Sequence, residues 1–127
     1  MIKHTVSTPN APAAIGPYSQ GVKVGNLIFT SGQLPLNPQS GELVADIEGA
    51  TQQSLDNVKA VLEAAGASMD NIIKIVVFLR DMNDFAAMNA VYATYFPNDP
   101  PARSAVQVAR LPKDAMLEIE AIAYLGI

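Results

Sequence analysis

The sequence predicts an α+β fold in which two helices cover one face of a mixed β-sheet. The order of elements is strand, strand, helix, strand, helix, strand, strand. Residues Ile72–Leu79 are almost continuously apolar, which is typical of a central strand buried on both faces. Right-handed crossovers place both helices on one face. Two helices cannot cover the second face, so we expect another copy of the chain to cover it, and we predict a homo-oligomer.

The N-terminal third is expected to contain loops and one hairpin. Residues 8–21 are rich in Pro, Ala, Gly and Ser, which predicts an ordered loop. Residues 22–24 and 27–31 are strand-like, and Gly25-Asn26 between them suits a tight turn. Residues 33–42 hold two prolines and a glycine and are predicted to form a loop.

Residues 46–65 are predicted to form the first helix. Leu55, Val58 and Leu62 recur at helical spacing, and Gly66 follows where a left-handed cap belongs. The second helix is expected to begin near Asp81, a good N-cap, and to end at Pro97. Strands are then predicted at residues 103–109 and 116–124.

Composition limits the class of protein. A chain of 127 residues fits one domain, 1–127, and half of its residues are apolar, with a mean hydropathy of +0.20. No run of about 18 apolar residues could cross a membrane, and the first ten residues lack the apolar stretch of a secretory signal. The absence of cysteine excludes disulfides and makes a structural zinc site very unlikely. We therefore expect a cytoplasmic protein without a membrane partner.

Charge and residue types exclude several kinds of chemistry. The net charge of −4 and the eight scattered Lys and Arg residues argue against a nucleic-acid partner. The single histidine, His4, is a weak candidate for a catalytic base, and no phosphate-loop motif occurs. No spacing of metal ligands is visible, so no metal is expected. An enzyme with this sequence would depend on Arg, Glu, Tyr, Ser or Thr side chains and on backbone groups.

Strand periodicity suggests where charged side chains gather. If the valines of residues 103–109 and the leucine side of residues 116–124 face the helices, the opposite face receives Arg103, Gln107, Glu118 and Glu120. Buried charges must be paired or must contact a ligand. The pattern leaves two interpretations open: a salt bridge between subunits or a ligand site.

Six ordered segments of the chain carry distinctive motifs, of which the most specific are GPYSQG, TSGQ, PARS and the ending ARLPKDA with EIEAIA. Together these segments resemble the reactive-intermediate deaminase family, RidA/YjgF, over nearly the whole chain. The resemblance implies a chorismate-mutase-like fold with a six-stranded sheet, a homotrimer, and active sites in clefts between subunits. It also implies the cofactor-free hydrolysis of 2-iminobutanoate and 2-iminopropanoate to 2-oxo acids and ammonia. These imines arise from enamines released by pyridoxal-phosphate enzymes, so the implied role is prevention of damage.

The resemblance also assigns roles to residues. Arg103 matches an arginine that binds the substrate carboxylate, and Glu118 matches an acid that positions the attacking water. Residues that line or support the pocket are Tyr18, Ser31, Gly32 and Asn89. The backbone carbonyl of Ala105 is expected to hold the imine nitrogen. Many members carry cysteine at this position, whereas this chain carries alanine, so thiol chemistry is impossible here. Glu120, which lies on the same strand face as Glu118, is expected to have a structural role.

Two other functions remain as alternatives. The same cleft could serve a regulatory or chaperone-like protein that binds small carboxylates, which saturable binding of 2-oxo acids without turnover would indicate. Ribonuclease activity or inhibition of translation is also attached to the family. The acidic composition and the missing pair of histidines make this third interpretation the weakest.

Overall fold

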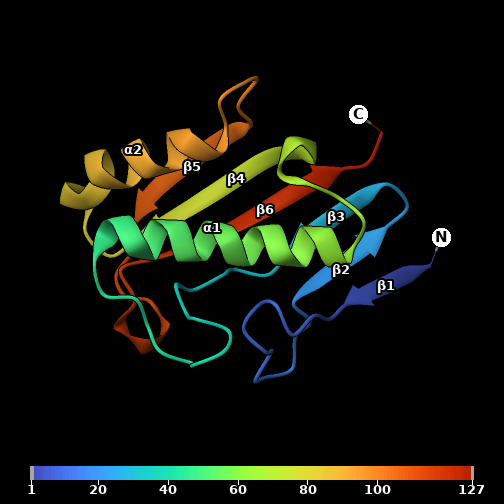
Figure 1. The fold of residues 1–127 in the computed structure, drawn as a ribbon, viewed down its shortest axis with the longest axis horizontal. Helices are drawn as coiled ribbons and strands as arrows, with labels where there is room; N and C mark the ends of the chain where they lie inside the picture. Colours follow the sequence, from blue (N-terminus) through green and yellow to red (C-terminus); the bar gives the residue numbers. More distant parts are fainter. Residues whose placement is uncertain (1, 127) are drawn as a thin grey trace.

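The computed structural model describes residues 2–126 and confirms the α+β class. A six-stranded sheet has the order β1-β2-β3-β6-β4-β5, and both helices lie on the same face of it (Figure 1). Only β4 and β5 pair in parallel, and α2 forms the crossover between them. The elements are β1 (Lys3–Val6), β2 (Gly21–Val24), β3 (Leu27–Thr30), α1 (Ile47–Ala64), β4 (Ile72–Leu79), α2 (Phe85–Tyr95), β5 (Ala102–Gln107) and β6 (Leu117–Tyr124).

The predicted hairpin is present between β2 and β3. Gly25 adopts a φ of 58°, a left-handed conformation that glycine reaches without a steric cost. The edge strand β1, which pairs with β2, lies outside the elements that local patterns predicted. Only Val6 of this strand is buried, so β1 carries no alternation of apolar and polar residues by which it could be recognised.

The first helix agrees closely with its prediction. The Asp46 side chain accepts a hydrogen bond from the backbone N–H of Gly49 (2.8 Å) and caps the helix. Gly66 follows the C-terminal end with a φ of 89°. Leu55, Val58 and Leu62 are fully buried, and α1 packs against β3, β6 and α2.

The second helix begins later than predicted. Asp81 caps a short 3₁₀ turn, Met82–Asp84, by accepting from the backbone N–H of Asn83 (2.9 Å), and α2 starts at Phe85. At its other end the Tyr95 hydroxyl donates to the Asp56 carboxylate of α1 (2.8 Å). This bond joins the two helices over the sheet.

The core fills the space between the sheet and the helices. Alternate residues of β4 and β6 point into it, among them Ile75, Val77 and Ile119, all fully buried. Within residues 2–126, no helix or strand covers the opposite face of the sheet, and Phe29 and Val106 remain about two-fifths exposed there. Val76 and Phe78 of β4 lie on this face and are partly exposed, so the second apolar face predicted for β4 exists, and no element of the described residues covers it.

One prediction about this face is wrong. Strand register pairs Ile75 of β4 with Arg103, and the neighbouring Val77 with Ala105, so these β5 residues face the helices. Glu118 of β6 instead pairs with Phe78 on the open face. Arg103 and Gln107 thus do not share a face with Glu118 and Glu120.

The physical reason lies in the place of β5 at the sheet edge, beneath the short helix α2. The guanidinium of Arg103 lies against the aromatic rings of α2 and so is accommodated on the helix side. The valine that was expected to face the helices, Val106, points to the uncovered face. The rule that valines mark the core fails where both faces are apolar.

Among residues 2–126, no helix is both long and apolar enough to span a bilayer.

Candidate functional site

A cavity of about 420 Å³ lies beside the end of β3 and the start of β6. Four of the residues predicted for the site line it: Tyr18, Ser31, Gly32 and Glu118. They come from the loop before β2, the turn after β3 and the open face of β6, so the fold brings together segments a hundred residues apart. We call these four residues the Glu118 half-site.

Hydrogen bonds fix the turn after β3 at the cavity wall. The Ser31 hydroxyl donates to the carbonyl of Ser19 (2.5 Å), and the Ser31 N–H donates to the carbonyl of Gln20 (2.9 Å). Two residues later, Gln33 and Ile119 exchange backbone hydrogen bonds of 2.8 and 3.1 Å. The turn is therefore tied both to the Tyr18 loop and to the strand that carries Glu118.

Gly32 leaves the space that the Glu118 carboxylate occupies. A Cβ atom built on Gly32 would lie 2.6 Å from both Cδ and Oε2 of Glu118. Contacts of this length between non-bonded heavy atoms do not occur without movement. A glycine is required here for close approach rather than for its backbone conformation.

The environment of Glu118 favours its neutral form. Burial raises the pKa of this half-buried carboxyl, and the negative charge of Glu120 on the same face raises it further. A carboxylate with a raised pKa is a stronger proton acceptor than an exposed one, which suits a general base. The raised pKa of Glu118, together with its position in the cavity wall beside Gly32, makes it a candidate catalytic group.

Two buried amides that support the cavity were not predicted. Gln20 accepts from the backbone N–H of Thr8 (2.7 Å) and donates to the carbonyl of Pro12 (2.8 Å), which holds the loop before β2. Asn57 of α1 donates to the carbonyls of Leu34 and Leu36 (3.1 and 2.9 Å) on the other wall. Asn57 interrupts the apolar stripe of its helix, and that interruption is a signal by which it could have been found.

Arg103 and Asn89 form a second cluster under α2. Nη1 of Arg103 donates to Oδ1 of Asn89 (2.6 Å), and the guanidinium carbon lies 4.6 Å from the ring centre of Tyr92 and 5.4 Å from that of Phe85. Within residues 2–126, no carboxylate lies at ion-pair distance from this guanidinium. The half-buried cation is therefore held in place while remaining available to an anion.

Tyr92 is the buried surface on which Arg103 rests. Burial raises the pKa of its phenol, and the nearby Arg103 charge opposes that shift. Its hydroxyl has no hydrogen-bond partner within residues 2–126. The sequence pattern did not identify this role of Tyr92, because helical spacing does not reveal which charged group will lie on an aromatic ring.

The backbone of Ala105 points toward the open edge of the sheet. The N–H of Val108 donates to the carbonyl of Leu79 (2.9 Å), and Leu79 is in register with Gln107. In a parallel pair every second residue directs its N–H and C=O to the same neighbour. The backbone groups of Ala105 therefore face away from β4, and β5 is the edge strand on that side of the sheet formed by residues 2–126.

Arg103, Asn89 and Ala105 form what we call the Arg103 half-site. They are not among the residues that line the Glu118 cavity, and the side chains of Arg103 and Glu118 lie on opposite faces of the sheet. One chain thus carries both sets of predicted residues without joining them. No group of three or more His, Cys, Asp or Glu side chains suited to a metal ion occurs in residues 2–126.

Comparisons with known proteins give one consistent family. The family model described as endoribonuclease L-PSP matches residues 8–125. The chain is 58% identical to the 2-iminobutanoate/2-iminopropanoate deaminase of Escherichia coli K12, across 94% of this chain and 95% of that protein. It is 57% identical to a RutC family protein of Pyrococcus horikoshii, across 97% and 98% of the two chains.

Solved structures have the same fold. A crystal structure of Escherichia coli TdcF with bound serine superposes with a TM-score of 0.93 at 54% identity, covering 95% of this chain and 98% of that one. The YjgF gene product of Escherichia coli superposes with a TM-score of 0.91 at 56% identity, with the same coverage. The resemblance inferred from the motifs is confirmed.

Proposed function

Because the chain belongs to the endoribonuclease L-PSP family, also called RidA/YjgF, we propose that it is a 2-iminobutanoate/2-iminopropanoate deaminase. It hydrolyses these 2-imino acids to 2-oxo acids and ammonia without a cofactor. The observation that carries the proposal is the identity of 58% over nearly the whole length of a relative bearing that name. The two half-sites supply the groups that the reaction needs.

Arg103 binds the carboxylate of the substrate. A guanidinium presents two parallel N–H donors that match the two oxygens of a carboxylate. Asn89 occupies one side of the guanidinium through the bond of 2.6 Å, and the rings of α2 hold its plane. The serine bound in TdcF is itself a small amino acid with a carboxylate, which agrees with this class of ligand.

Glu118 manages the protons of the hydrolysis. The carboxylate accepts a proton from a water molecule as the water oxygen adds to the carbon of the protonated imine, and the product is a neutral tetrahedral carbinolamine. Glu118 then returns this proton to the nitrogen. The hydroxyl group of the carbinolamine passes its own proton to the Glu118 carboxylate as the C=O bond forms, the C–N bond breaks and ammonia leaves. The carbonyl of Ala105 orients the imine nitrogen, and no thiol is needed.

A complete site requires two chains. The Arg103 half-site lies under α2 and the Glu118 half-site lies on the other face of the sheet, so we propose that a neighbouring subunit brings the two together. The uncovered apolar face with Phe29 and Val106 supports association. We propose a homotrimer, as the family resemblance implies, in which the rotation between neighbouring subunits closes these head-to-tail contacts into a ring.

Coupled turnover tests the function. Threonine dehydratase generates 2-iminobutanoate, semicarbazide traps the imine that escapes, and this protein should raise the yield of 2-oxobutanoate at the expense of the semicarbazone. Glu118→Gln should abolish most of this effect, because an amide cannot accept the proton of water. Saturable binding of 2-oxobutanoate without any turnover would instead support the alternative carboxylate-binding function. A cytoplasmic location remains a prediction.

Mixed assemblies test the shared site. Arg103→Ala and Glu118→Gln subunits are each expected to be inactive alone. If every site takes Arg103 from one chain and Glu118 from another, a random equal mixture should recover about a quarter of wild-type activity, since each half is intact in one chain of two. A site within one chain would recover nothing.

A further inference from the structure

A short turn, Pro112–Asp114, forms one lip of the Glu118 cavity and has an unusual backbone. Lys113 and Asp114 have φ values of 59° and 54°, so two successive residues with side chains adopt the left-handed conformation. This conformation crowds the Cβ atom of any residue except glycine, so it persists only where the surroundings hold it.

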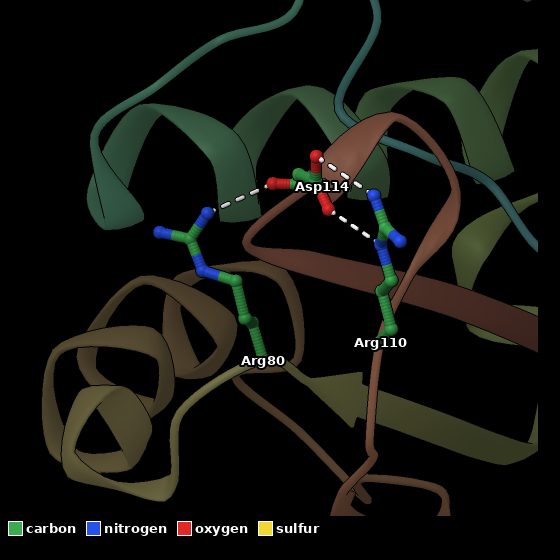
Figure 2. A network of polar contacts seen from close by, with 3 residues as sticks. All are labelled: Arg80, Arg110 and Asp114. Carbon is green, nitrogen blue, oxygen red and sulfur yellow. Dashed lines mark hydrogen bonds and ion pairs between the residues drawn. The ribbon is translucent and has the colours of Figure 1, made fainter.

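Two arginines hold the lip at Asp114 (Figure 2). Nη1 of Arg80 donates to the backbone carbonyl of Asp114 (2.8 Å), and Nε of Arg110 donates to Oδ1 of its carboxylate (2.8 Å). The hydrogen bond and charge of Arg110 keep the pKa of Asp114 below its ordinary value, so this carboxylate stays ionised. Arg80 follows β4 and Arg110 precedes the lip, so the contacts come from two separate segments.

Buried residues fix both ends of the same turn. Leu111 and Ala115 flank the lip, and both are buried. The N–H of Ala115 donates to the carbonyl of Pro112 (3.2 Å), which closes the turn. The lip is thus restrained at each end and at its exposed tip.

The restrained lip contributes one positively charged residue to the lining of the cavity. Pro112 and Lys113 line it, and Lys113 is the only cationic residue among the lining residues, as Glu118 is the only anionic one. No carboxylate of residues 2–126 lies within ion-pair distance of the Lys113 ammonium group. The chain as a whole carries a net charge of −4, which repels an anionic substrate. A cationic residue at the cavity makes the local electrostatic potential more favourable for such a substrate.

We propose that Lys113 is a further substrate-binding residue, whose ammonium group attracts the carboxylate of the imino acid into the cavity. Asp114 is its positioning residue, held by Arg80 and Arg110. This inference rests on the proposed deaminase function. It gives a functional reason for a strained backbone at the cavity lip.

The first experiment compares Lys113→Gln with Lys59→Gln in the assembled enzyme. Both variants lose one positive charge, but Lys59 is exposed on α1 and does not line the cavity. At low ionic strength Lys113→Gln should lower kcat/KM about three- to fivefold through KM, with kcat unchanged, and Lys59→Gln should have no effect. Added salt should reduce the difference. Equal kinetics for the two variants, or a loss in kcat alone, would overturn the role of Lys113.

The second experiment tests positioning. Arg110→Gln should raise KM in the wild-type background, Arg110→Lys should restore part of the loss, and Arg110→Gln should add nothing in the Lys113→Gln background. Additive losses, or no loss from Arg110→Gln, would overturn the positioning role. Thermal melting of each variant checks that the fold is retained.

A direct titration separates this inference from the function on which it rests. Amide resonances of the protein are followed as 2-oxobutanoate, the unreactive product, is added. If the wild-type protein hydrolyses no imine, the deaminase function fails. Weaker binding of 2-oxobutanoate by Lys113→Gln than by Lys59→Gln would still support a carboxylate-attracting lysine, and equal binding would exclude it.

Discussion

The contact between Gly32 and Glu118 allows the most direct test of the site. Gly32→Ala adds one methyl group 2.6 Å from the Glu118 carboxylate, whereas ordinary contact begins at 3.4 Å. The carboxylate must retreat by the 0.8 Å that separates these two distances. The backbone of Gly32 is not left-handed, so alanine fits the chain itself without strain.

The expected loss follows from the size of this displacement. A shift of about 1 Å in a catalytic group costs roughly a hundredfold in rate, so we expect kcat/KM to fall about 30- to 100-fold. The melting temperature should change little, because Gly32 is exposed and the carboxylate can move into the cavity. Coupled imine turnover measures the first quantity and calorimetry the second.

A matched control and a double variant make the test specific. A Cβ on Gly16, in the same loop region as Tyr18, would meet only ordinary contacts of 3.5 Å, so Gly16→Ala should keep its activity. In a Glu118→Gln background, Gly32→Ala should cost almost nothing more. The reasoning is refuted if Gly32→Ala retains full activity while Glu118→Gln has none.

The environments of Arg103, Glu118, Ala105 and Tyr95 lead to four further predictions. Arg103→Lys should lower kcat/KM about ten- to a hundredfold with little change in oligomer stability, because lysine loses the planar fork. Glu118→Gln should be more stable than wild type at neutral pH. The pKa of Glu118 is raised in the folded state, so the stability of the wild-type protein falls as the pH rises past the ordinary pKa of glutamate. The difference in melting temperature between the two proteins should therefore vanish in acid. Ala105→Cys should be nearly neutral in turnover, and a large gain in rate would contradict the proposed mechanism. Tyr95→Phe should lower the free energy of unfolding in urea by about 1 kcal/mol without loss of activity, since it removes the bond to Asp56.

The fold could be predicted from local patterns because most elements carry their own signals. The first helix, the burial of its stripe of Leu55, Val58 and Leu62, and the turn at Gly25 are confirmed. Residues Ile72–Leu79 form the strand at the predicted bounds. The short strand β1 has no such signal, since its pairing with β2 through the backbone does not depend on its side chains.

The division of the site could not be predicted from periodicity. Alternation along β5 puts Arg103 and Val106 on different sides of the strand, but it does not show which side chain points toward the helices. The orientation depends on α2, which provides aromatic rings for the guanidinium of Arg103. Asn89 was expected to support the pocket, and the structure places it against Arg103. The supporting amides of Gln20 and Asn57 depend on contacts with distant loops, which no local pattern reveals.

If sites are shared between subunits as proposed, the placement of Arg103 and Glu118 on opposite faces of one sheet has a genetic consequence. Where every site is assembled from two chains, an inactive allele does not act alone: two defective alleles with lesions on opposite faces complement each other in the same cell. A duplicated gene would likewise not evolve independently of its parent while the two products still assemble. Hybrid rings would combine the carboxylate-binding face of one copy with the acid–base face of the other, so selection on either face would act on both genes.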